Sequence, residues 1–406
     1  MNATDAASLI YQTVDLINAR AVREFSVPPR TYIGPGAIAK IGDAIVERGF
    51  EKVFVLIDDT LEQLGLADVM YRALRASALD YEVYRQAPRE PDTDMVETIG
   101  RHLGERSFDV VVAFGGGSIL DAAKGAVVLA ANPTARIGDI ARDPALITKR
   151  RMPFFAVPTT AGTGSEATNA TVIIDPASHV KHLLIHPDMI PDLAVIDACL
   201  TLRTPPRFTA IAGVDAMTHA IEAYVAMHAT PLTKALAYRA LTLIGEALPV
   251  AVGQGNDVQA RESMMLASYM AGVAFSNAGL GLCHAMAHQI GGAYDLPHGM
   301  ANAVLLPSVM VFNQLVCKRE FCEIGHALSG RILEPQQTIA HIQDLIVELG
   351  LPGNLKLPEV KPDDFDAFAE SALNDPSITT NPRTVSKAQI VEVFKHAYAR
   401  QGEDFR

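Results

Sequence analysis

Short apolar runs alternate with helical periodicity through the first half of the chain. In residues 66–77 and 94–105 the apolar positions recur every three or four residues, which predicts amphipathic helices. Uninterrupted apolar runs lie around these segments and predict buried strands at 52–59, 81–84, 108–117 and 154–160. Continuous apolar strands separated by helices are typical of an α/β domain with a doubly wound, mostly parallel, Rossmann-like sheet.

The pattern changes twice further along the chain. Residues 170–186 contain two strand-like runs around Asp-Pro-Ala-Ser, which predicts a hairpin appended to the sheet. From about Pro205 onward strand signals nearly vanish, and long Ala-, Leu- and Met-rich stretches with helical periodicity follow. Several of these helices are so apolar that we expect them to be buried in an all-α C-terminal domain. The predicted domains are residues 1–200 and residues 201–406.

Composition and charge narrow the class of protein. The chain has 406 residues and a mass of 43.5 kDa, which is enough for two domains with separate cores. Apolar residues make up 49% and charged residues 20%, as in a globular protein. The net charge of −12 argues against a nucleic-acid partner. No run approaches the roughly 18–20 apolar residues of a membrane span, so we expect no membrane partner.

The N-terminus and the cysteines indicate a cytoplasmic protein. Residues 1–22 lack the features of a secretory signal and predict an amphipathic helix. We expect it to pack on the protein or on a partner subunit, with a targeting role as the alternative. Its apolar face consists of Leu9, Ile10, Val14 and Ile17. The four cysteines form no Cys-x-x-Cys pair, so we expect neither a disulfide framework nor a zinc knuckle.

Two loops rich in glycine and hydroxyl groups follow predicted strands. The first, GGGSILDAAK at 115–124, opens a helix whose N–H groups and dipole favour an anion such as a pyrophosphate. It is not the G-x-G-x-x-G fingerprint, and a tight turn that needs glycine for steric reasons is the alternative. The second loop is PTTAGTGSEAT at 158–168. Two such loops at strand ends suit a crevice that holds a nucleotide.

The first predicted strand ends in two acidic residues, Asp58 and Asp59. An acidic side chain at this place can bond a ribose hydroxyl and repel a 2′-phosphate, which favours NAD over NADP. Capping of the following helix explains the same residue equally well from the sequence alone.

Acidic and histidine side chains supply candidate chemistry in the helical half. Asp215 and His219 lie four residues apart in an apolar helix, so they share one face. A mutually satisfied Asp–His pair explains them, and so does a divalent metal completed by a second helix. Residues 281–299 hold three more histidines, whose spacing alone does not assign them: His284, His288 and His298. Carboxylate and imidazole ligands without thiolate suit Fe²⁺ or Zn²⁺.

Four motifs resemble, in the same order, those of the iron-containing (group III) alcohol dehydrogenases. They are GGGSILDAAK, PTTAGTGSEAT, GVDAMTHAIEAY and GLCHAMAHQIGGAYDLPHGMANAVLLP. The resemblance runs from SVPPRTYIGPGAI near the N-terminus to NPRT at 381–384, so it covers nearly the whole chain. Within the family the sequence looks nearest to the ethanol dehydrogenase-like protein of ethanolamine utilisation and to propanediol (lactaldehyde) reductases.

The resemblance implies roles for individual residues. The family's metal ligands fall on Asp215, His219, His284 and His298. Its other cleft histidine, near the nicotinamide, falls on His288. Its nucleotide-binding positions fall on Asp58, Gly116, Gly117, Ser118, Asp121, Thr159, Thr160, Thr163 and Lys181. The sequence departs from the family at Arg89, Glu90 and Pro91, where several relatives have Pro-Asn-Pro near the adenosine. This departure leaves the adenosine contacts open.

The implied reaction is reversible hydride transfer between a small primary alcohol and NAD⁺. A metal, Fe²⁺ or alternatively Zn²⁺, would act as a Lewis acid on the substrate oxygen. His288 would relay a proton or contact the nicotinamide. Residues 1–200 would then be the dinucleotide-binding domain and residues 201–406 the metal-binding, catalytic domain. The family also suggests a homo-oligomer, a dimer or larger. Near the histidine segment we expect pocket walls formed by Phe275, Leu280 and Tyr294.

Several alternatives remain at this stage. A glycerol dehydrogenase or another enzyme similar to dehydroquinate synthase would combine NAD and a metal on the same architecture. An enzyme similar to maleylacetate reductase would be expected to lack the metal ligands, so the intact Asp/His/His/His set speaks against it. A metallohydrolase and a non-catalytic metal-binding component of an assembly are alternatives of a different class.

Overall fold

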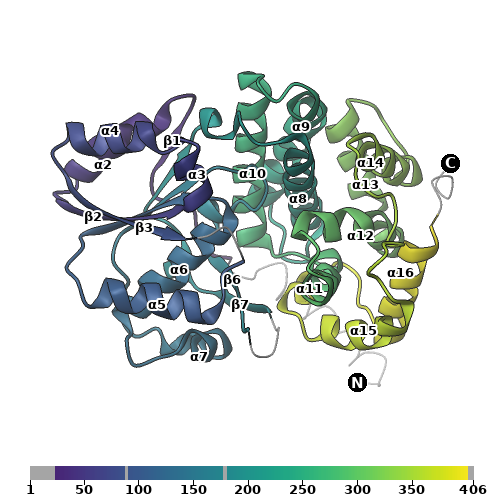
Figure 1. Ribbon diagram of the computed structural model, residues 1–406. Coiled ribbons are helices and arrows are strands. Elements are labelled where there is room, and N and C mark those ends of the chain that lie inside the picture. Colours follow the sequence, from purple (N-terminus) through teal and green to yellow (C-terminus); the bar gives the residue numbers. More distant parts are fainter. Residues whose placement is uncertain (1–22, 87–89, 177–180, 401–406) are drawn as a thin grey trace, which may run out of the picture.

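The computed structural model describes residues 23–86, 90–176 and 181–400, with a sheet-containing half beside a helical half (Figure 1). The predicted amphipathic helix at 1–22 and the residue Arg89 lie outside the described residues. Six parallel strands form one sheet in the order β1-β8-β5-β4-β2-β3. Their bounds are β1 Thr31–Ile33, β2 Lys52–Asp58, β3 Asp80–Gln86, β4 Val110–Gly115, β5 Phe154–Pro158 and β8 Leu193–Ile196.

Helices cover both faces of this sheet. They are α2 Ile41–Val46, α3 Asp59–Gln63, α4 Asp68–Ala76, α5 Thr93–Gly104, α6 Gly117–Ala131 and α7 Ile137–Arg142. Strand β2 shows why both faces need cover, because its side chains are buried in alternation on opposite sides. Val53 and Val55 pack towards α2 and α4, whereas Phe54 and Leu56 pack towards α5 and α6. The predicted doubly wound, mostly parallel α/β architecture is therefore confirmed.

The predicted hairpin is also present. Strands β6 (Ala170–Ile174) and β7 (Lys181–Ile185) pair antiparallel as a separate two-stranded sheet. Ile173 of β6 and Leu184 of β7 join the apolar cluster under α5 and α6, so the hairpin is fastened to that side of the main sheet.

Two strands were not predicted from the sequence. Strand β1 has three residues and β8 has four, which is too short for a periodicity argument. Strand β8 pairs with both β1 and β5, and β1 forms the edge of the sheet. Only the tertiary pairing identifies these segments as strands.

The second half of the described chain is helical. Its helices are α8 Pro206–Val225, α9 Pro231–Gly253, α10 Val258–Ala278, α11 Leu282–Tyr294, α12 His298–Asn313, α13 Lys318–Ser329, α14 Pro335–Glu348, α15 Phe365–Leu373 and α16 Lys387–Ala399. One cluster of buried apolar residues, from Ala210 to Ala397, forms their core. The all-α character of this half is confirmed, while the domain boundary at residue 200 stays a prediction.

Helix α9 has the length and apolar composition of a membrane span. Of the helices in the described residues, it is long and apolar enough to cross a bilayer, and α10 with α11 would also qualify if that bent pair were one span. The core helix of a soluble protein can meet the same criteria. Ala237, Leu241, Ile244 and Leu248 of α9 are buried in the helical core. The packing of α9 is therefore that of a core helix.

The loop after β5 joins the two halves. A Cβ atom placed on Gly164, whose φ is +61°, would lie 2.7 Å from the Cα of Gly272 in α10. A Cβ atom on Gly162 would lie 2.9 Å from Cβ of Ala212 in α8. Because only glycine permits backbones to approach this closely, these residues bring the carboxyl ends of the strands against the helices. The cleft described next lies at this junction.

Candidate active site and metal centre

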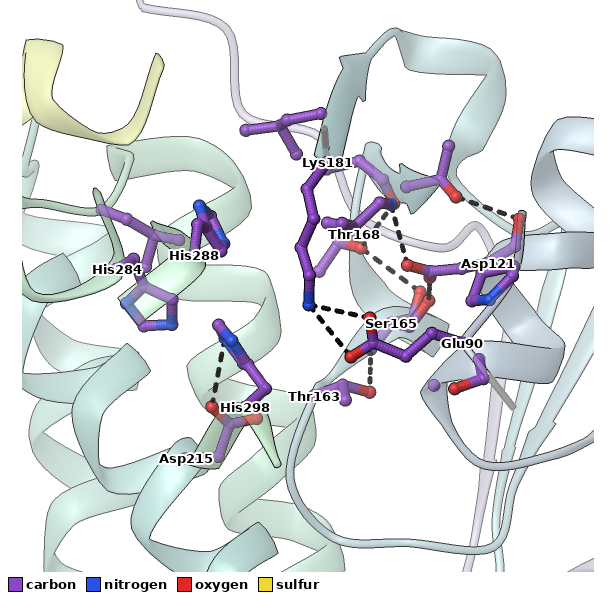
Figure 2. Close-up of a pocket in the computed structure, with 18 of the residues that line it drawn as sticks. Glu90, Asp121, Thr163, Ser165, Thr168, Lys181, Asp215, His284, His288 and His298 are labelled. Atoms are coloured by element: carbon purple, nitrogen blue, oxygen red, sulfur yellow. Dashed lines mark hydrogen bonds and ion pairs between the residues drawn. The ribbon is translucent and has the colours of Figure 1, made fainter. Parts of the chain in front are cut away.

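One cavity lies between the carboxyl ends of the strands and the helical half (Figure 2). Loop and hairpin residues line one side, and the predicted metal ligands line the other. Of the predicted nucleotide residues, those that line it are Gly117, Ser118, Asp121, Thr163 and Lys181. The other four lie outside its described lining: Asp58, Gly116, Thr159 and Thr160. The location matches the rule that ligands of open α/β sheets bind beyond the carboxyl ends of the strands.

Four side chains from three helices meet at the inner side of this cavity. Asp215 and His219 come from successive turns of α8, His284 comes from the first turn of α11, and His298 begins α12. One potential ligand atom from each lies within 4.8 Å of the other three. A carboxylate oxygen with three imidazole nitrogens fits a divalent ion such as Fe²⁺ or Zn²⁺. The four predicted metal ligands are thus brought together, and their role stays a prediction.

The protonation states of this cluster favour a cation. Burial lowers the pKa values of His284 and His298 well below the ordinary imidazole range, and neighbouring histidines add to the shift. Neutral imidazole is the form that binds metals. Burial also raises the pKa of Asp215, and the hydrogen bond from Asn302 opposes this shift. A buried carboxylate beside neutral imidazoles is stabilised by a bound cation.

Buried polar groups orient two of these imidazole rings. Glu222, one turn after His219 on α8, lies 2.5 Å from Nδ1 of His284 through Oε2. Its Oε1 accepts a hydrogen bond of 2.7 Å from the backbone N–H of Cys283. Burial raises the pKa of Glu222 to about 7. Nδ1 of His219 lies 3.3 Å from the carbonyl oxygen of Gly162. Partners at Nδ1 leave Nε2 of His284 and His219 available for a ligand.

Asn302 completes this buried shell from α12. Its Nδ2 donates to Oδ1 of Asp215 at 2.8 Å and lies 3.3 Å from Nε2 of both His284 and His298. The sequence motifs did not predict a role for Asn302 or Glu222. Both lie on the face of a predicted ligand helix, Glu222 seven residues after Asp215 and Asn302 four after His298. That helical spacing was the available signal.

His288 stands apart from the four-residue cluster. It lies one turn after His284 on α11, and its ring stacks on that of His298 with centroids 5.3 Å apart. Its Nδ1 lies 2.7 Å from Oδ2 of Asp375, the N-cap residue of a short 3₁₀ helix. Burial would raise the pKa of Asp375, but the hydrogen bond and charge of His288 hold it below its usual value. Asp375 was not predicted from the sequence, because it lies in no recognisable motif.

The two glycine-rich loops touch each other at the cavity wall. Gly116 is the N-cap residue of α6, and Gly117 begins the helix. A Cβ atom on Gly117 would lie 2.6 Å from Cγ2 of Thr163, and one on Gly116 would lie 3.4 Å from Cγ2 of Thr160. Close contacts with the second loop therefore explain why glycine occupies these two positions. They also leave the N–H groups at the start of α6 close to the cavity, so the two explanations are compatible.

Asp121 and Lys124 of α6 hold the second loop and the hairpin. Asp121 accepts hydrogen bonds from Oγ of Ser165 at 2.6 Å and from the backbone N–H of Val172 at 2.9 Å. The buried ammonium of Lys124 donates to the carbonyl oxygens of Thr168 and Ala170, at 3.1 and 2.7 Å. The carboxylate of Asp121 thus makes protein contacts here, and its predicted contact with a nucleotide stays a prediction.

Asp58 caps the helix that follows its strand. Its Oδ1 accepts hydrogen bonds from the backbone N–H groups of Thr60 at 2.8 Å and Leu61 at 3.4 Å. The capping explanation is therefore correct for this side chain. A second role at a ribose, which would use the other carboxylate oxygen, stays a prediction.

The predicted pocket walls divide between two cavities. Phe275 and Leu280 line the main cavity, and the Phe275 ring stacks on His219 with centroids 4.4 Å apart. Tyr294 instead lines a second, outer cavity that shares Glu90 and Ile174 with the main one. The Tyr294 hydroxyl donates to Asp364 at 2.6 Å. The expectation that Tyr294 walls the same cavity as Phe275 and Leu280 does not match the structure, because its hydroxyl is bonded to Asp364 and its ring packs edge-on against Phe368.

Comparisons with known proteins agree with this geometry. Residues 28–198 match the model of the iron-containing alcohol dehydrogenase family, and residues 209–398 match the model of the C-terminal region of Fe-containing alcohol dehydrogenases. The chain is 46% identical over 389 residues to the probable alcohol dehydrogenase EutG of Salmonella typhimurium, covering 96% of this chain and 98% of that protein.

Two further relatives extend the comparison. The NAD-dependent methanol dehydrogenase of Bacillus methanolicus is 38% identical over 381 residues, covering 92% of this chain and 99% of that one. Among solved structures, a 1,3-propanediol oxidoreductase superposes with a TM-score of 0.88 at 34% identity, covering 93% of this chain and 100% of the other.

Proposed function

The chain belongs to the iron-containing alcohol dehydrogenase family, and on this basis we propose that it interconverts small primary alcohols and aldehydes with NAD and a divalent metal, Fe²⁺ or alternatively Zn²⁺. The family and its relatives support alcohol–aldehyde oxidoreductase activity. The observation that carries the cofactor proposal is one cavity lined by both a four-donor cluster and two glycine-rich loops.

Asp215, His219, His284 and His298 would hold the metal. A divalent cation in this place supplies a Lewis acid for the oxygen of an alcohol or aldehyde. Glu222 and the carbonyl of Gly162 fix the rotation of two imidazole rings through Nδ1. Asn302 holds Asp215 in place. These contacts reduce the rearrangement that binding requires.

The glycine-rich loops would hold the dinucleotide. The N–H groups at Gly117 and Ser118 suit the pyrophosphate, and Thr163 and Lys181 line the path towards the histidines. Asp121, Thr159 and Thr160 would support the loop side of the cavity. Gly116 is the N-cap residue of α6. Asp58 would bond the adenosine ribose and favour NAD over NADP.

The overall reaction is alcohol plus NAD⁺ giving aldehyde, NADH and a proton. The hydride leaves the alcohol carbon for the nicotinamide, and the hydroxyl proton must reach solvent. His288 lines the cavity and has Nδ1 bonded to Asp375, so Nε2 is the atom that would accept this proton or contact the nicotinamide. Asp375 keeps the ring oriented for either role.

The test is NADH absorbance. Protein supplied with Fe²⁺ or Zn²⁺ and NAD⁺ is mixed with a panel of short alcohols, and the reverse reaction is run with NADH and aldehydes. We expect NADH formation that requires the metal. No nucleotide-dependent change with any alcohol or aldehyde would contradict the proposal. Hydrolysis of ester or amide substrates under those conditions would favour a metallohydrolase.

We also propose a cytoplasmic homo-oligomer, a dimer or larger, without nucleic-acid or membrane partners. The acidic net charge and the four unpaired cysteines support this proposal. So does the edge strand β1, whose Ile33 is 52% exposed. Size-exclusion chromatography with light scattering measures the oligomeric state. A monomer at micromolar concentration would contradict the proposed oligomer.

A further inference from the structure

One segment near the C-terminus contacts all three helices that carry the predicted metal ligands. It comprises residues 375–383 and includes the start of the NPRT motif. The carbonyl oxygen of Thr380 accepts a hydrogen bond of 2.9 Å from the N–H of Met227, two residues after α8. Oγ1 of Thr380 donates to the carbonyl oxygen of Leu280, just before α11, at 2.7 Å. The third helix, α12, is reached through Asn381.

The side-chain amide of Asn381 makes four hydrogen bonds in a buried place, where 3% of the residue is exposed. Its Oδ1 accepts from the N–H of Leu282, the first residue of α11, at 3.1 Å. The same oxygen accepts from Nδ2 of Asn313, the last residue of α12, at 3.0 Å. Nδ2 of Asn381 donates to Oδ1 of Asn313 at 3.0 Å and to the carbonyl oxygen of Arg383 at 2.7 Å. Both donors and both acceptor positions of this amide are used, which fixes its orientation.

The first turn of α11 depends on partners from other parts of the chain. Its N-cap residue is Gly281, which has no side chain to accept from the first N–H groups of the helix. The N–H of Leu282 instead donates to Asn381, and the N–H of Cys283 donates to Glu222 of α8 at 2.7 Å. These two residues of α11 directly precede its predicted metal ligand. Two distant side chains therefore fix the turn from which that ligand projects.

We propose that Asn381 is a positioning residue of the metal site, which holds His284 at the right place relative to the ligands of α8 and α12. Glu222 orients the imidazole ring, whereas Asn381 places the backbone that carries it and ties this backbone to α12. Without the amide, the first turn of α11 would shift and move Nε2 of His284 away from the other three donors. Metal affinity is sensitive to such a shift, because the ligands must meet the ion at fixed distances. This inference rests on the proposed function and adds a residue to its metal site.

The test uses Co²⁺ in the full-length protein, because the visible absorption of bound Co²⁺ reports the coordination geometry. Metal-free wild type and Asn381→Ala are titrated with Co²⁺ while this absorption is followed. In N381A the affinity for Co²⁺ should fall on the order of tenfold, and the absorption band should change in position or intensity. A residue that only adds stability would lower the melting temperature of the metal-free protein and leave the spectrum of bound Co²⁺ unchanged. Wild-type affinity and spectrum in folded N381A would overturn the proposal.

Two further variants make the result specific. Asn313→Ala removes the connection to α12 but leaves the bond between Leu282 and Asn381, so its affinity for Co²⁺ should fall less, by about threefold. If N381A does not fold, N313A decides, and wild-type affinity and spectrum in N313A would contradict the proposal. Thr379→Ala is the matched control, because Thr379 is exposed and bonds the carbonyl oxygen of Pro376 within the same segment. Equal losses in T379A and N381A would show that Asn381 has no particular role.

Activity and nucleotide binding separate this inference from the proposed function. A wild type that binds Co²⁺ but oxidises no alcohol would contradict the proposed function, while a changed spectrum in N381A would still support the role of Asn381. An active wild type with the same spectrum as N381A would overturn the role of Asn381 alone. The affinity for NADH should be equal in both proteins, since the glycine-rich loops line the opposite side of the cavity. Weaker NADH binding with unchanged Co²⁺ binding in N381A would also overturn it.

Discussion

The proposed metal site and the two glycine-rich loops hold their functional groups in different ways. In the cluster, side chains orient side chains across long stretches of sequence: Glu222 contacts His284 over 62 positions, and Asn302 contacts Asp215 over 87. In the loops, glycines let backbones touch, and α6 fastens the second loop and the hairpin through Asp121. The cluster thus depends on charge and hydrogen-bond geometry, whereas the loops depend on the absence of a Cβ atom.

The largest effect is expected when the cluster loses a ligand. Asp215→Ala and His284→Ala should abolish metal binding and lower turnover by on the order of 10³-fold or more, because Lewis-acid stabilisation is lost. Metal content by elemental analysis and the rate of NADH formation are measured together. His341→Ala, a histidine of α14 outside the cluster, is the control. Full metal content and rate in His284→Ala would show that the ligand assignment is wrong.

Removing the support of one ligand should have a smaller effect. Glu222→Gln keeps the size of the side chain but takes away the charge that faces Nδ1 of His284. We expect metal affinity to fall about 10- to 100-fold. Titration of the metal-free protein by calorimetry measures this without turnover. Glu246→Gln, an exposed residue of α9, should bind metal as wild type does, and equal affinities in both variants would contradict the role of Glu222.

The loops should be sensitive to a single methyl group. In Gly117→Ala the new Cβ would lie 2.6 Å from Cγ2 of Thr163, so Thr163 or the loop that carries it must shift. The affinity for NADH, followed by fluorescence, should fall about tenfold, while metal binding stays unchanged. Gly138→Ala is the matched control, because nothing lies within 4 Å of its Cβ position. Loss of metal without loss of NADH binding would reverse the assignment of the two regions.

The smallest effect concerns pH and a second buried acid. Burial raises the pKa of Glu166, in the second loop, to about 7 from an ordinary value of 4.5. The folded state then binds more protons than the unfolded state between these values, so stability falls as pH rises through that window. Glu166→Gln should remove this loss and be more stable than wild type at pH 8 by about 1 kcal/mol or more. Urea unfolding at pH 4.5 and pH 8 checks the difference, and parallel pH curves would contradict it.

The local patterns predicted more of the fold than of the contacts that position the site. Uninterrupted apolar runs such as 52–59 located the long strands, and the two runs around Asp-Pro-Ala-Ser located the hairpin. Strands β1 and β8 were missed because their sequences are too short to show a period. Their identity depends on pairing between segments more than 160 residues apart.

The candidate site shows the same limit. The motifs identified four candidate metal ligands, and the structure places these side chains next to one another. They are Asp215, His219, His284 and His298. The motifs were silent about Asp375, because the bond between His288 and Asp375 spans 87 residues and appears only after the helices have packed. The position of Tyr294 likewise depends on contacts with Asp364 and Phe368, which lie far along the chain.

The gathering of four ligands from three helices has a thermodynamic consequence. One ion held by side chains of α8, α11 and α12 would cross-link the chain between positions 215 and 298, much as a disulfide closes a loop. Because such an ion binds the native state and not the unfolded chain, its free energy of binding adds to that of folding. The melting temperature therefore reports metal loading directly. A chelator should therefore lower the melting temperature of the protein in the absence of substrate.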